Sequence, residues 1–507
     1  MNALIALICF TASPIGAIFL TPEAWFVTVQ TPVGNIRGIS KVRNGQTINV
    51  FHGIPYAEAP TGGLRFNKPV PRAPFRSTYD ATNSSSAFAC LSIVKQTLVS
   101  FSEDCLRLSV YVPDSASTRT EKKPVMIFIH GGGFYSGSSA QYDGSMLAGS
   151  DVIYVAINYR LAQLGFLSTE SGMVEGNFGL WDQHMAIQWV HDNIESFGGN
   201  VNDVTIFGQS AGSSSVMYQS MYAGNKGLFQ RVIAESGSTT SSWAYKNVKT
   251  STQNAYRFAN HCGCHQTTED TMVACLRSLT STEMANCLTT YTDGYSFDDL
   301  AWTVTADDDF VAVDQWRMFT DSDATRTDLT FFRSLDLLIG VNKGDGLVFL
   351  GDWMSRIQTN LTANPAVTTQ QFRDNILPAY LKFGKDFGTV NPAFLEKVFS
   401  FYAEDASLAM LRNLVQFTTD ICFTAPSVLA LNAHDTHGVG RSYFYEFAYS
   451  PDVHFLPGIP AIDDGTLANH GAELHFIFGD AGTFTNPVEQ RLAKTMVTMW
   501  TNFAKTG

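Results

Sequence analysis

The chain of 507 residues lacks internal repeats, low-complexity tracts and long charged linkers. Charged residues make up only 16% of it and hydrophobic residues 45%, which excludes a disordered chain and indicates a folded one. Basic residues are the minority, with 33 Lys and Arg against 46 Asp and Glu and a net charge of −13. This balance argues against a nucleic-acid partner. The acidic excess is more simply explained by solubility than by the steering of a cationic substrate.

Long hydrophobic runs are also missing after the N-terminus, so we expect no transmembrane segment beyond it. Residues 2–10 form an apolar run of signal-peptide length, and small residues that include Gly16 and Ala17 follow as a cleavage zone. We therefore expect a signal peptide over residues 1–20 and a single domain over residues 21–507. The alternative is an uncleaved N-terminal anchor, which we disfavour although no Lys or Arg precedes the run.

Cysteine is scarce, and Cys9 lies in the expected signal peptide. In an exported protein the other cysteines indicate disulfide bonds with one thiol left over. They are Cys90, Cys105, Cys262, Cys264, Cys275, Cys287 and Cys422. The segment Cys262-Gly263-Cys264-His265 could supply zinc ligands, but Cys275 and Cys287 are too dispersed for a second ligand pair. We therefore expect no metal.

Two acceptor motifs for N-linked glycosylation occur, Asn83-Ser84-Ser85 and Asn360-Leu361-Thr362. Such motifs mark surface loops of secreted proteins, although two are also expected by chance in a chain this long. Together with the apolar N-terminus and the cysteines, they indicate a secreted, disulfide-bonded glycoprotein.

Short apolar runs alternate with helical patterns along most of the chain, as in buried parallel sheets. The runs are residues 125–129, 152–157, 204–207, 231–234, 335–341 and 442–447. Residues 182–193 have apolar side chains near helical spacing. The alternation predicts an α/β fold with a doubly wound, mostly parallel sheet. We expect residues 27–50 to add antiparallel strands at one edge, and residues 241–328 to form a helical cap.

A nucleophile-elbow pattern follows the third run, in the segment Gly208-Gln209-Ser210-Ala211-Gly212. Such an elbow turns a buried strand sharply into a helix and holds the serine hydroxyl at the top of the sheet. Residues 213–222 contain no Gly or Pro and can form that helix. Because Gly is common in this chain, the pattern is expected by chance in roughly one of every few chains of this length, and a Gly/Ser turn after a strand is the alternative.

The chemistry of acyl transfer also requires a base, a group that orients it and donors for an oxyanion. In doubly wound folds these lie where strands end. After residues 125–129 comes a glycine loop, His130-Gly131-Gly132-Gly133-Phe134, of the kind that aims N–H groups at an oxyanion. Asp345 follows residues 335–341, and His470 lies in a loop after the last run.

By themselves, these residues have ordinary structural interpretations. Asp345 could simply form a turn, and His434, His437 and His475 compete with His470 for the role of base. The chain order Ser210, Asp345, His470 is the Ser…Asp/Glu…His order of α/β-hydrolases. This order, with its members after predicted strands, favours a catalytic triad.

With these motifs the chain resembles the type-B carboxylesterase/lipase family, which includes cholinesterases and bile-salt-activated lipases. The resemblance covers nearly the whole chain after the signal. Besides the elbow, the matching segments are residues 51–57, 103–113, 158–161, 177–183 and 197–200. It implies an α/β-hydrolase fold with helical cap insertions, and no metal or organic cofactor.

The resemblance also implies roles for single residues. Ser210 would be the nucleophile, His470 the general base and Asp345 the acid that orients it. Cholinesterases usually have Glu at the last of these positions, and Asp is an accepted variant among α/β-hydrolases. The backbone N–H groups of Gly132, Gly133 and Ala211 would form the oxyanion hole.

The family's disulfides would map onto Cys90–Cys105 and Cys264–Cys275, and a bridge between Cys262 and Cys287 would be an addition. Cys422 would pair with a cysteine near the family's C-terminus, which this chain does not reach. We therefore expect a truncated C-terminus and an unpaired Cys422.

Two departures from the cholinesterase pattern bear on the substrate. No Trp lies between Cys90 and Cys105, where cholinesterases bind choline by a cation–π contact, and Gln209 replaces the Glu that precedes their nucleophile. We therefore predict a general carboxylesterase or lipase that acts on small-molecule or lipid esters. The alternatives are a cholinesterase-type enzyme and a non-catalytic, neuroligin-like binding protein. That kind of protein has lost the serine that is present here.

Overall fold

The computed structural model of the protein describes residues 25–507 except 44, 93–99, 119, 120, 266, 292–294, 297, 298, 313–326, 382–390, 437, 453–458 and 480–483. The expected signal peptide and His437 therefore lie outside the described residues.

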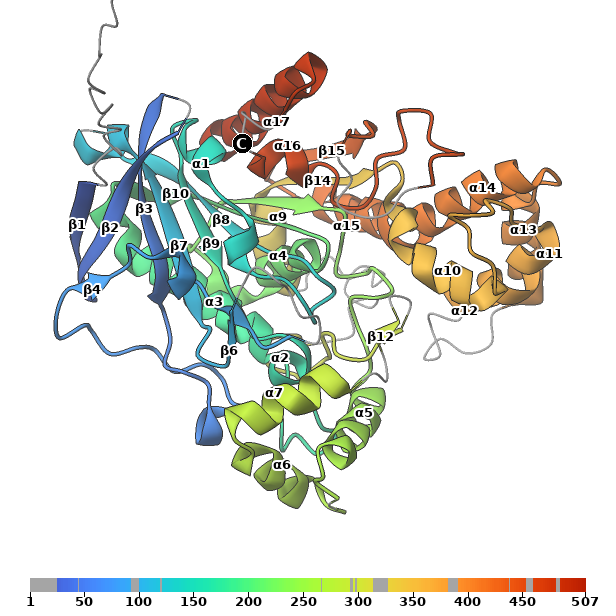
Figure 1. The fold of residues 1–507 in the computed structure, drawn as a ribbon, viewed down its shortest axis with the longest axis horizontal. Helices are drawn as coiled ribbons and strands as arrows, with labels where there is room; N and C mark the ends of the chain where they lie inside the picture. The colour runs from blue at the N-terminus through green and yellow to red at the C-terminus, as the bar shows by residue number, and fades with distance from the viewer. Residues whose placement is uncertain are drawn as a thin grey trace, which may run out of the picture.

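A mixed sheet forms the centre of the molecule (Figure 1). In the described part of the chain its strand order is β1-β2-β3-β7-β9-β8-β10-β11-β14-β15, with β4 beside β2. The bounds are β1 (Trp25–Thr31), β2 (Gly34–Arg43), β3 (Gln46–Pro55), β4 (Tyr79–Asp80), β7 (Arg107–Pro113), β8 (Lys123–Ile129), β9 (Ile153–Ile157), β10 (Gly199–Gln209), β11 (Arg231–Glu235), β14 (Asp336–Asn342) and β15 (Ser442–Phe447). Short strand pairs β5 (Ala89–Cys90) with β6 (Phe101–Ser102), and β12 (Tyr295–Ser296) with β13 (Asp299–Leu300), lie outside it.

The six predicted apolar runs all lie in this sheet. The strands β9, β8, β10, β11, β14 and β15 run parallel to one another. The predicted antiparallel edge is formed by β1, β2 and β3. Strand β7, which the sequence pattern did not single out, is antiparallel to both β3 and β9 and joins the two parts.

The central parallel strands β8 and β9 are apolar along most of their length because both of their faces are buried. In β8, Ile127 belongs to one core cluster and Phe128 to the other, since successive side chains point to opposite faces. Helix α4 packs on β10 and β11, and helix α17 packs on β8 and β10. Val216 of α4 lies in the first cluster and Trp500 of α17 in the second. Helices thus cover both faces, as the alternation predicts.

The helices connect and flank the strands. Their bounds are α1 (Ser145–Ala148), α2 (Ala162–Phe166), α3 (Phe178–Asn193), α4 (Ala211–Met221), α5 (Val248–His261), α6 (Glu269–Ser278), α7 (Ser281–Thr290), α9 (Thr327–Ser334), α10 (Leu350–Ile357), α11 (Thr369–Gln371), α12 (Leu377–Leu381), α13 (Pro392–Tyr402), α14 (Ser407–Thr419), α15 (Ala425–Asp435), α16 (Leu474–Phe478) and α17 (Pro487–Thr506). The predicted helices at 182–193 and 213–222 correspond to α3 and α4.

Two groups of helices extend from the sheet. Helices α5, α6 and α7, in the segment expected to form a cap, lie together on one side (Figure 1). Helices α10 to α14 form a second group, far from β1, that the sequence pattern did not predict. The buried Arg65–Glu103 ion pair, at 2.7 Å, ties the first group to the rest, because Arg65 also donates to the carbonyl of Leu276 at the end of α6.

One helical stretch, Ser407–Asp435, is long and apolar enough to cross a membrane by composition alone. Its apolar side chains are largely buried within the protein; Leu411 and Leu414, for example, are fully buried. It also packs against the turn that carries Asp345, where the N–H of Gly346 donates to Thr419 Oγ1 at 2.9 Å. These contacts are those of a core helix.

Candidate active site

Ser210 lies at the junction between β10 and α4, in a strained backbone conformation with φ 59° and ψ −124°. Its N–H donates to the carbonyl of Glu235 on the neighbouring strand at 2.8 Å, and its carbonyl accepts from Ser214 at 3.0 Å. A non-glycine residue with this φ costs free energy and persists where the surrounding structure holds it, commonly at functional sites. The sheet and the first turn of α4 together hold Ser210 in the elbow geometry.

The two glycines of the elbow are required by close backbone approach. A Cβ on Gly212 would lie 2.0 Å from the carbonyl oxygen of Ile129, and one on Gly208 would lie 2.5 Å from that of Gly212. No side chain fits at such distances, so the strand-to-helix turn can be this tight only with glycine at both positions.

Asp345 and His470, which are 125 residues apart, meet in a hydrogen bond. His470 Nδ1 lies 2.7 Å from Asp345 Oδ1, and both side chains are buried. The other carboxylate oxygen, Oδ2, accepts from the N–H of Asn342 at 2.7 Å. Because a carboxylate only accepts, the shared proton belongs to Nδ1, so in a ring with a single proton Nε2 is the acceptor.

Backbone contacts hold the loops of these two residues side by side. The N–H of Gly344 donates to the carbonyl of Ala468 at 2.8 Å, and Gly344 and Asn469 form an isolated parallel bridge. The Asn342 amide donates to the carbonyl of Asn469, also at 2.8 Å. The Phe423 ring packs on the imidazole of His470, with 4.9 Å between ring centroids. The orientation of the imidazole is therefore held from several directions.

The structure does not join Ser210 to His470 by a hydrogen bond. Among the described residues the Ser210 hydroxyl has no hydrogen-bond partner, and His470 Nε2 instead lies 3.1 Å from the amide nitrogen of Gln209. The imidazole thus faces the elbow, but its Nε2 contacts Gln209, the residue before the serine. The sequence pattern singled out Gln209 as a departure, but not as a partner of His470.

The glycine loop follows β8 and lies against the elbow. A Cβ on Gly131 would lie 2.6 Å from the carbonyl oxygen of Gln209. Gly132 and Gly133 have φ of 108° and 61°, which favour glycine. Within the described chain, the N–H groups of Gly132, Gly133 and Ala211 have no acceptor. All three are free to bind an anionic oxygen, and that of Ala211 lies at a helix N-terminus.

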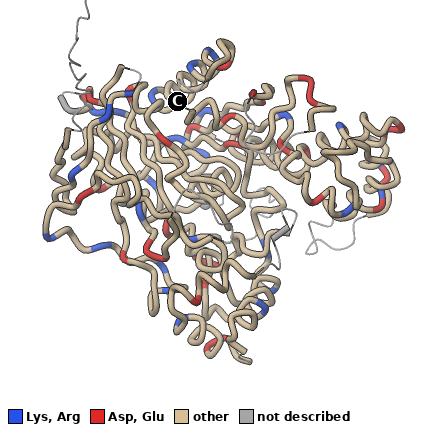
Figure 2. Tube along the Cα trace, in the orientation of Figure 1, with Lys and Arg blue, Asp and Glu red and all other residues tan. Residues whose placement is uncertain are grey.

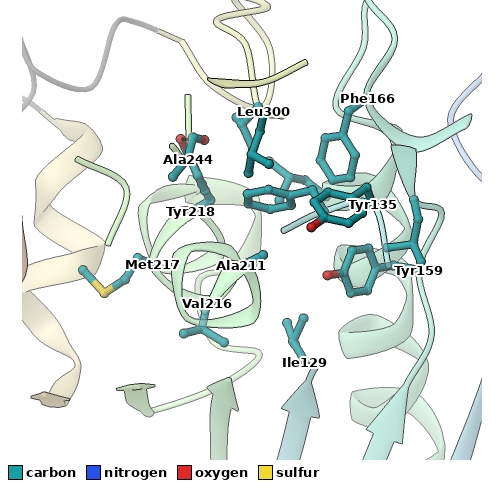
Figure 3. Close-up of a cluster of buried hydrophobic side chains, with 14 of the residues drawn as sticks. Ile129, Tyr135, Tyr159, Phe166, Ala211, Val216, Met217, Tyr218, Ala244 and Leu300 are labelled. Atoms are coloured by element: carbon teal, nitrogen blue, oxygen red, sulfur yellow. Dashed lines mark hydrogen bonds between the residues drawn. The ribbon is translucent and has the colours of Figure 1, made fainter. Parts of the chain in front are cut away.

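Aromatic and apolar side chains lie beyond the strand ends. Figure 3 shows Ala211 next to the tip of β8, with Tyr135, Phe166 and Leu300 on the side away from Ile129. Residues of the segment expected to form a cap thus lie over the carboxyl ends of the strands. They would surround a bound molecule with apolar surface.

Two buried carboxyl groups near His470 were not predicted. Glu473 lies three residues after His470, and burial, followed by the charge of Asp345, raises its pKa to about 7. Glu235 lies beside Gln209 in the β10–β11 pairing, and burial raises its pKa well above the usual value. Only tertiary contacts reveal their burial, because nothing in the sequence separates them from surface glutamates.

The competing histidines have other partners. His434 is buried, with Nδ1 2.8 Å from Ser442 Oγ and Nε2 2.9 Å from the carbonyl oxygen of Leu335. His475 packs against Phe476 and Phe484. In the part of the chain that the structure describes, no three His, Cys, Asp or Glu side chains are grouped as metal ligands would be.

The structure contains the disulfides Cys90–Cys105 and Cys264–Cys275. Cys262, Cys287 and Cys422 are free thiols, so the additional bridge is not formed here. Cys262 and Cys287 nevertheless interact, and the neighbouring Cys287, after burial, raises the pKa of the Cys262 thiol.

Comparison with known proteins identifies relatives of this chain. The sequence profile of the carboxylesterase family matches residues 26–507. The chain belongs to the carboxylesterase family. It is 32% identical to bile salt-activated lipase of Bos taurus, over 97% of this chain and 81% of the relative. It is 31% identical to cholinesterase of Mus musculus, over 96% of this chain and 79% of the relative.

Membership in the carboxylesterase family agrees with the α/β-hydrolase fold described above, and the lipase and cholinesterase relatives support an ester hydrolase. A third relative is not named as an enzyme. The chain is 32% identical to neuroligin-2 of Mus musculus, over 96% of this chain and 61% of the relative.

Proposed function

We propose that this carboxylesterase-family protein is a secreted serine hydrolase of carboxylic esters that works through an acyl-enzyme on Ser210. The observation that carries the proposal is the 2.7 Å contact between Asp345 and His470, with Nε2 of the imidazole turned toward the strained elbow of Ser210. A serine, a base and a group that orients the base are the parts that acyl transfer requires.

In the proposed mechanism, His470 Nε2 accepts the Ser210 proton as Oγ attacks the ester carbonyl. The resulting oxyanion is stabilised by the N–H groups of Gly132, Gly133 and Ala211, each worth about 3 kcal/mol in comparable sites. The protonated ring then gives its proton to the leaving alcohol. Asp345 stabilises the charged imidazole through Nδ1 without taking its proton.

Deacylation repeats these steps with water as the nucleophile. His470 removes a proton from the water, the water oxygen attacks the acyl carbon, and the proton returns to Ser210 Oγ as the acid departs. Each bond that the first step forms is thereby broken in the second, and the free enzyme is regenerated.

The proposed substrates are general small-molecule or lipid esters. The apolar residues beyond the strand ends, such as Phe166 and Leu300, support an apolar acyl or alcohol group. The amide at Gln209 adds no negative charge that would attract choline. Rates on p-nitrophenyl esters of increasing acyl length would identify the preferred chain, and equal rates at every length would contradict an apolar binding site.

The test of the nucleophile is Ser210→Ala, with hydrolysis of p-nitrophenyl butyrate and labelling by a fluorescent organophosphonate as readouts. We expect the wild type to do both and the variant to do neither, since only an activated serine reacts with the phosphonate. Ser220→Ala is the control, because this buried serine lies at the far end of α4. Full activity of the Ser210 variant would contradict the mechanism. A wild type inert in both assays would favour a binding protein.

We also propose secretion of residues 21–507 as one domain, after removal of a signal peptide over residues 1–20. Two disulfides support an oxidising compartment, and both sequon asparagines, Asn83 and Asn360, are exposed. Protein recovered from the medium of expressing eukaryotic cells should lose mass when an N-glycosidase removes its glycans. Retention of all the protein inside the cells would contradict secretion.

A further inference from the structure

The contact between Gln209 and His470 suggests a role for Gln209. His470 Nε2 has one lone pair, which lies in the plane of the ring, and the Gln209 amide nitrogen lies 3.1 Å from it. An amide N–H can donate to this lone pair when the ring is neutral. Gln209 is 95% buried, so water does not compete freely for the contact.

The same lone pair is the one that the proposed mechanism needs. Ser210 becomes a nucleophile only when Nε2 takes its proton, and a single lone pair accepts one good hydrogen bond at a time. In the described residues the Ser210 hydroxyl has no hydrogen bond, while Gln209 has the one to His470. We propose that Gln209 occupies the lone pair of His470 in the resting protein and so competes with Ser210 for the base. This inference rests on the function proposed above.

The Gln209 amide has a donor end and an acceptor end, so it can hydrogen-bond to the His470 ring in its neutral and in its charged state. Its oxygen faces Gly131, where a Cβ would lie 3.1 Å away, and its nitrogen faces Gly471, where a Cβ would lie 3.6 Å away. Neither glycine has a side chain that would block a rotation exchanging the two ends of the amide. Its oxygen would then accept from Nε2–H once the ring is charged. The amide thus donates to the neutral base and accepts from the protonated one.

A carboxylate at position 209 could only accept, and it would not occupy the lone pair of the neutral ring. It would also add negative charge beside the buried Asp345, Glu235 and Glu473. Glutamine avoids this fourth charge. Its amide N–H, however, must leave Nε2 of His470 before that nitrogen can accept the proton of Ser210. We therefore expect Ser210 to react more slowly with small probes than the same serine would without the amide donor.

The test is the second-order rate constant for phosphonylation of Ser210 in Gln209→Met, which keeps the length of the side chain but has no N–H. We expect this rate constant to rise by about threefold to tenfold, because the variant lacks one ordinary hydrogen bond that stabilises the resting enzyme. Gln230→Met is the control, because its side chain binds the N–H of Val204, five residues before Gln209 on the same strand. If Gln209→Met fails to fold, Gln209→Leu takes its place, because it also removes the donor and adds no charge.

The outcomes separate the two proposals. A wild type that is not labelled at Ser210 overturns the proposed function. A wild type that is labelled, together with a folded Gln209 variant that reacts at the same rate or more slowly, overturns the competition and leaves the function standing. If Gln209 only supports the structure of the site, its replacement should slow the reaction, whereas the competition predicts a faster one.

Discussion

At the scale of single residues, the buried Glu473 and Glu235 are the groups whose ionisation differs most from that of exposed glutamates. Glu473 Oε2 accepts from the Asn342 amide, and Glu235 Oε1 accepts from the Trp500 indole at 2.6 Å. The second oxygen of each has no hydrogen-bond partner in the described residues. A buried carboxylate with an unpaired oxygen is costly, so burial favours the neutral acid.

This environment makes stability depend on pH through Glu473. Its folded-state pKa is raised from 4.5 to about 7, so the folded protein binds the proton more tightly than the unfolded chain does. The stability that the bound proton gives is complete below pH 4.5 and is lost as the pH rises through 7. Glu473→Gln stays neutral, so we expect it to be more stable than wild type at pH 8, by about 3 kcal/mol, and similar at pH 4.5.

Denaturant midpoints of wild type and variant at the two pH values would measure this difference. Glu446→Gln, at an exposed position on β15, is the matched control and should show no such dependence. If Glu473→Gln differs from wild type equally at both pH values, ionisation of Glu473 is not the cause.

Much of the candidate site could be read from the sequence because its members follow strands. Ser210 and Asp345 come directly after buried runs, and parallel strands bring their ends to one edge of the sheet. His470 was harder to choose, since its loop lies 22 residues after β15 and three other histidines competed. The contact of Gln209 with His470 could not be predicted, because it depends on side-chain rotamers across 261 residues of sequence.

At the scale of elements, helices α5, α6 and α7 form one unit held by a disulfide bond and a hydrogen bond. Cys264–Cys275 links the turn after α5 to α6. At the other side of the unit, His261 Nε2 lies 2.9 Å from Thr290 Oγ1 at the end of α7. Cys262 follows His261, and Cys287 lies one helical turn before Thr290, so the two thiols are neighbours.

We therefore expect Cys262 and Cys287 to form a third disulfide under oxidising conditions. Oxidised glutathione would take two electrons, and two protons would leave as the S–S bond forms. Non-reducing peptide mapping should yield one linked peptide, lighter by two hydrogens than its parts. The bridge should add about 3 kcal/mol to stability, as for loops of similar length. Cys287→Ala should remove both effects, and Cys422→Ala neither. Two alkylated thiols in the oxidised protein would contradict the prediction.

The fold was predictable where elements repeat a pattern and not where tertiary packing decides. The central strands β8 and β9 are buried on both faces, so each reads as a continuous apolar run. Strand β7 lies where the antiparallel edge meets the parallel part, and the pattern did not show it as a strand. The group α10 to α14 also went unpredicted, since its helices are short or amphipathic and pack against each other outside the alternation of strands and helices.

At the scale of the whole molecule, charge is spread thinly. Figure 2 shows acidic and basic residues interspersed along the trace and separated by long uncharged stretches. The acidic excess of 13 charges is therefore not concentrated in one segment. A diffuse field can raise the encounter rate of a cationic substrate at low salt, but a bound cation also needs a local partner.

The diffuse charge and the neutral amide at Gln209 lead to a prediction about choline. Butyrylcholine and 3,3-dimethylbutyl butyrate have nearly the same shape and differ in the positive charge. A desolvated cation–π site would prefer the choline ester by about thirtyfold in kcat/KM. At physiological salt we expect the kcat/KM values of the two esters to agree within about threefold, because screening removes most long-range steering under those conditions. Any excess for the choline ester should appear only at low salt. Added salt at about 0.5 M screens the attraction of the diffuse charge. A large preference for the choline ester that persists at this salt concentration would therefore require a local choline site.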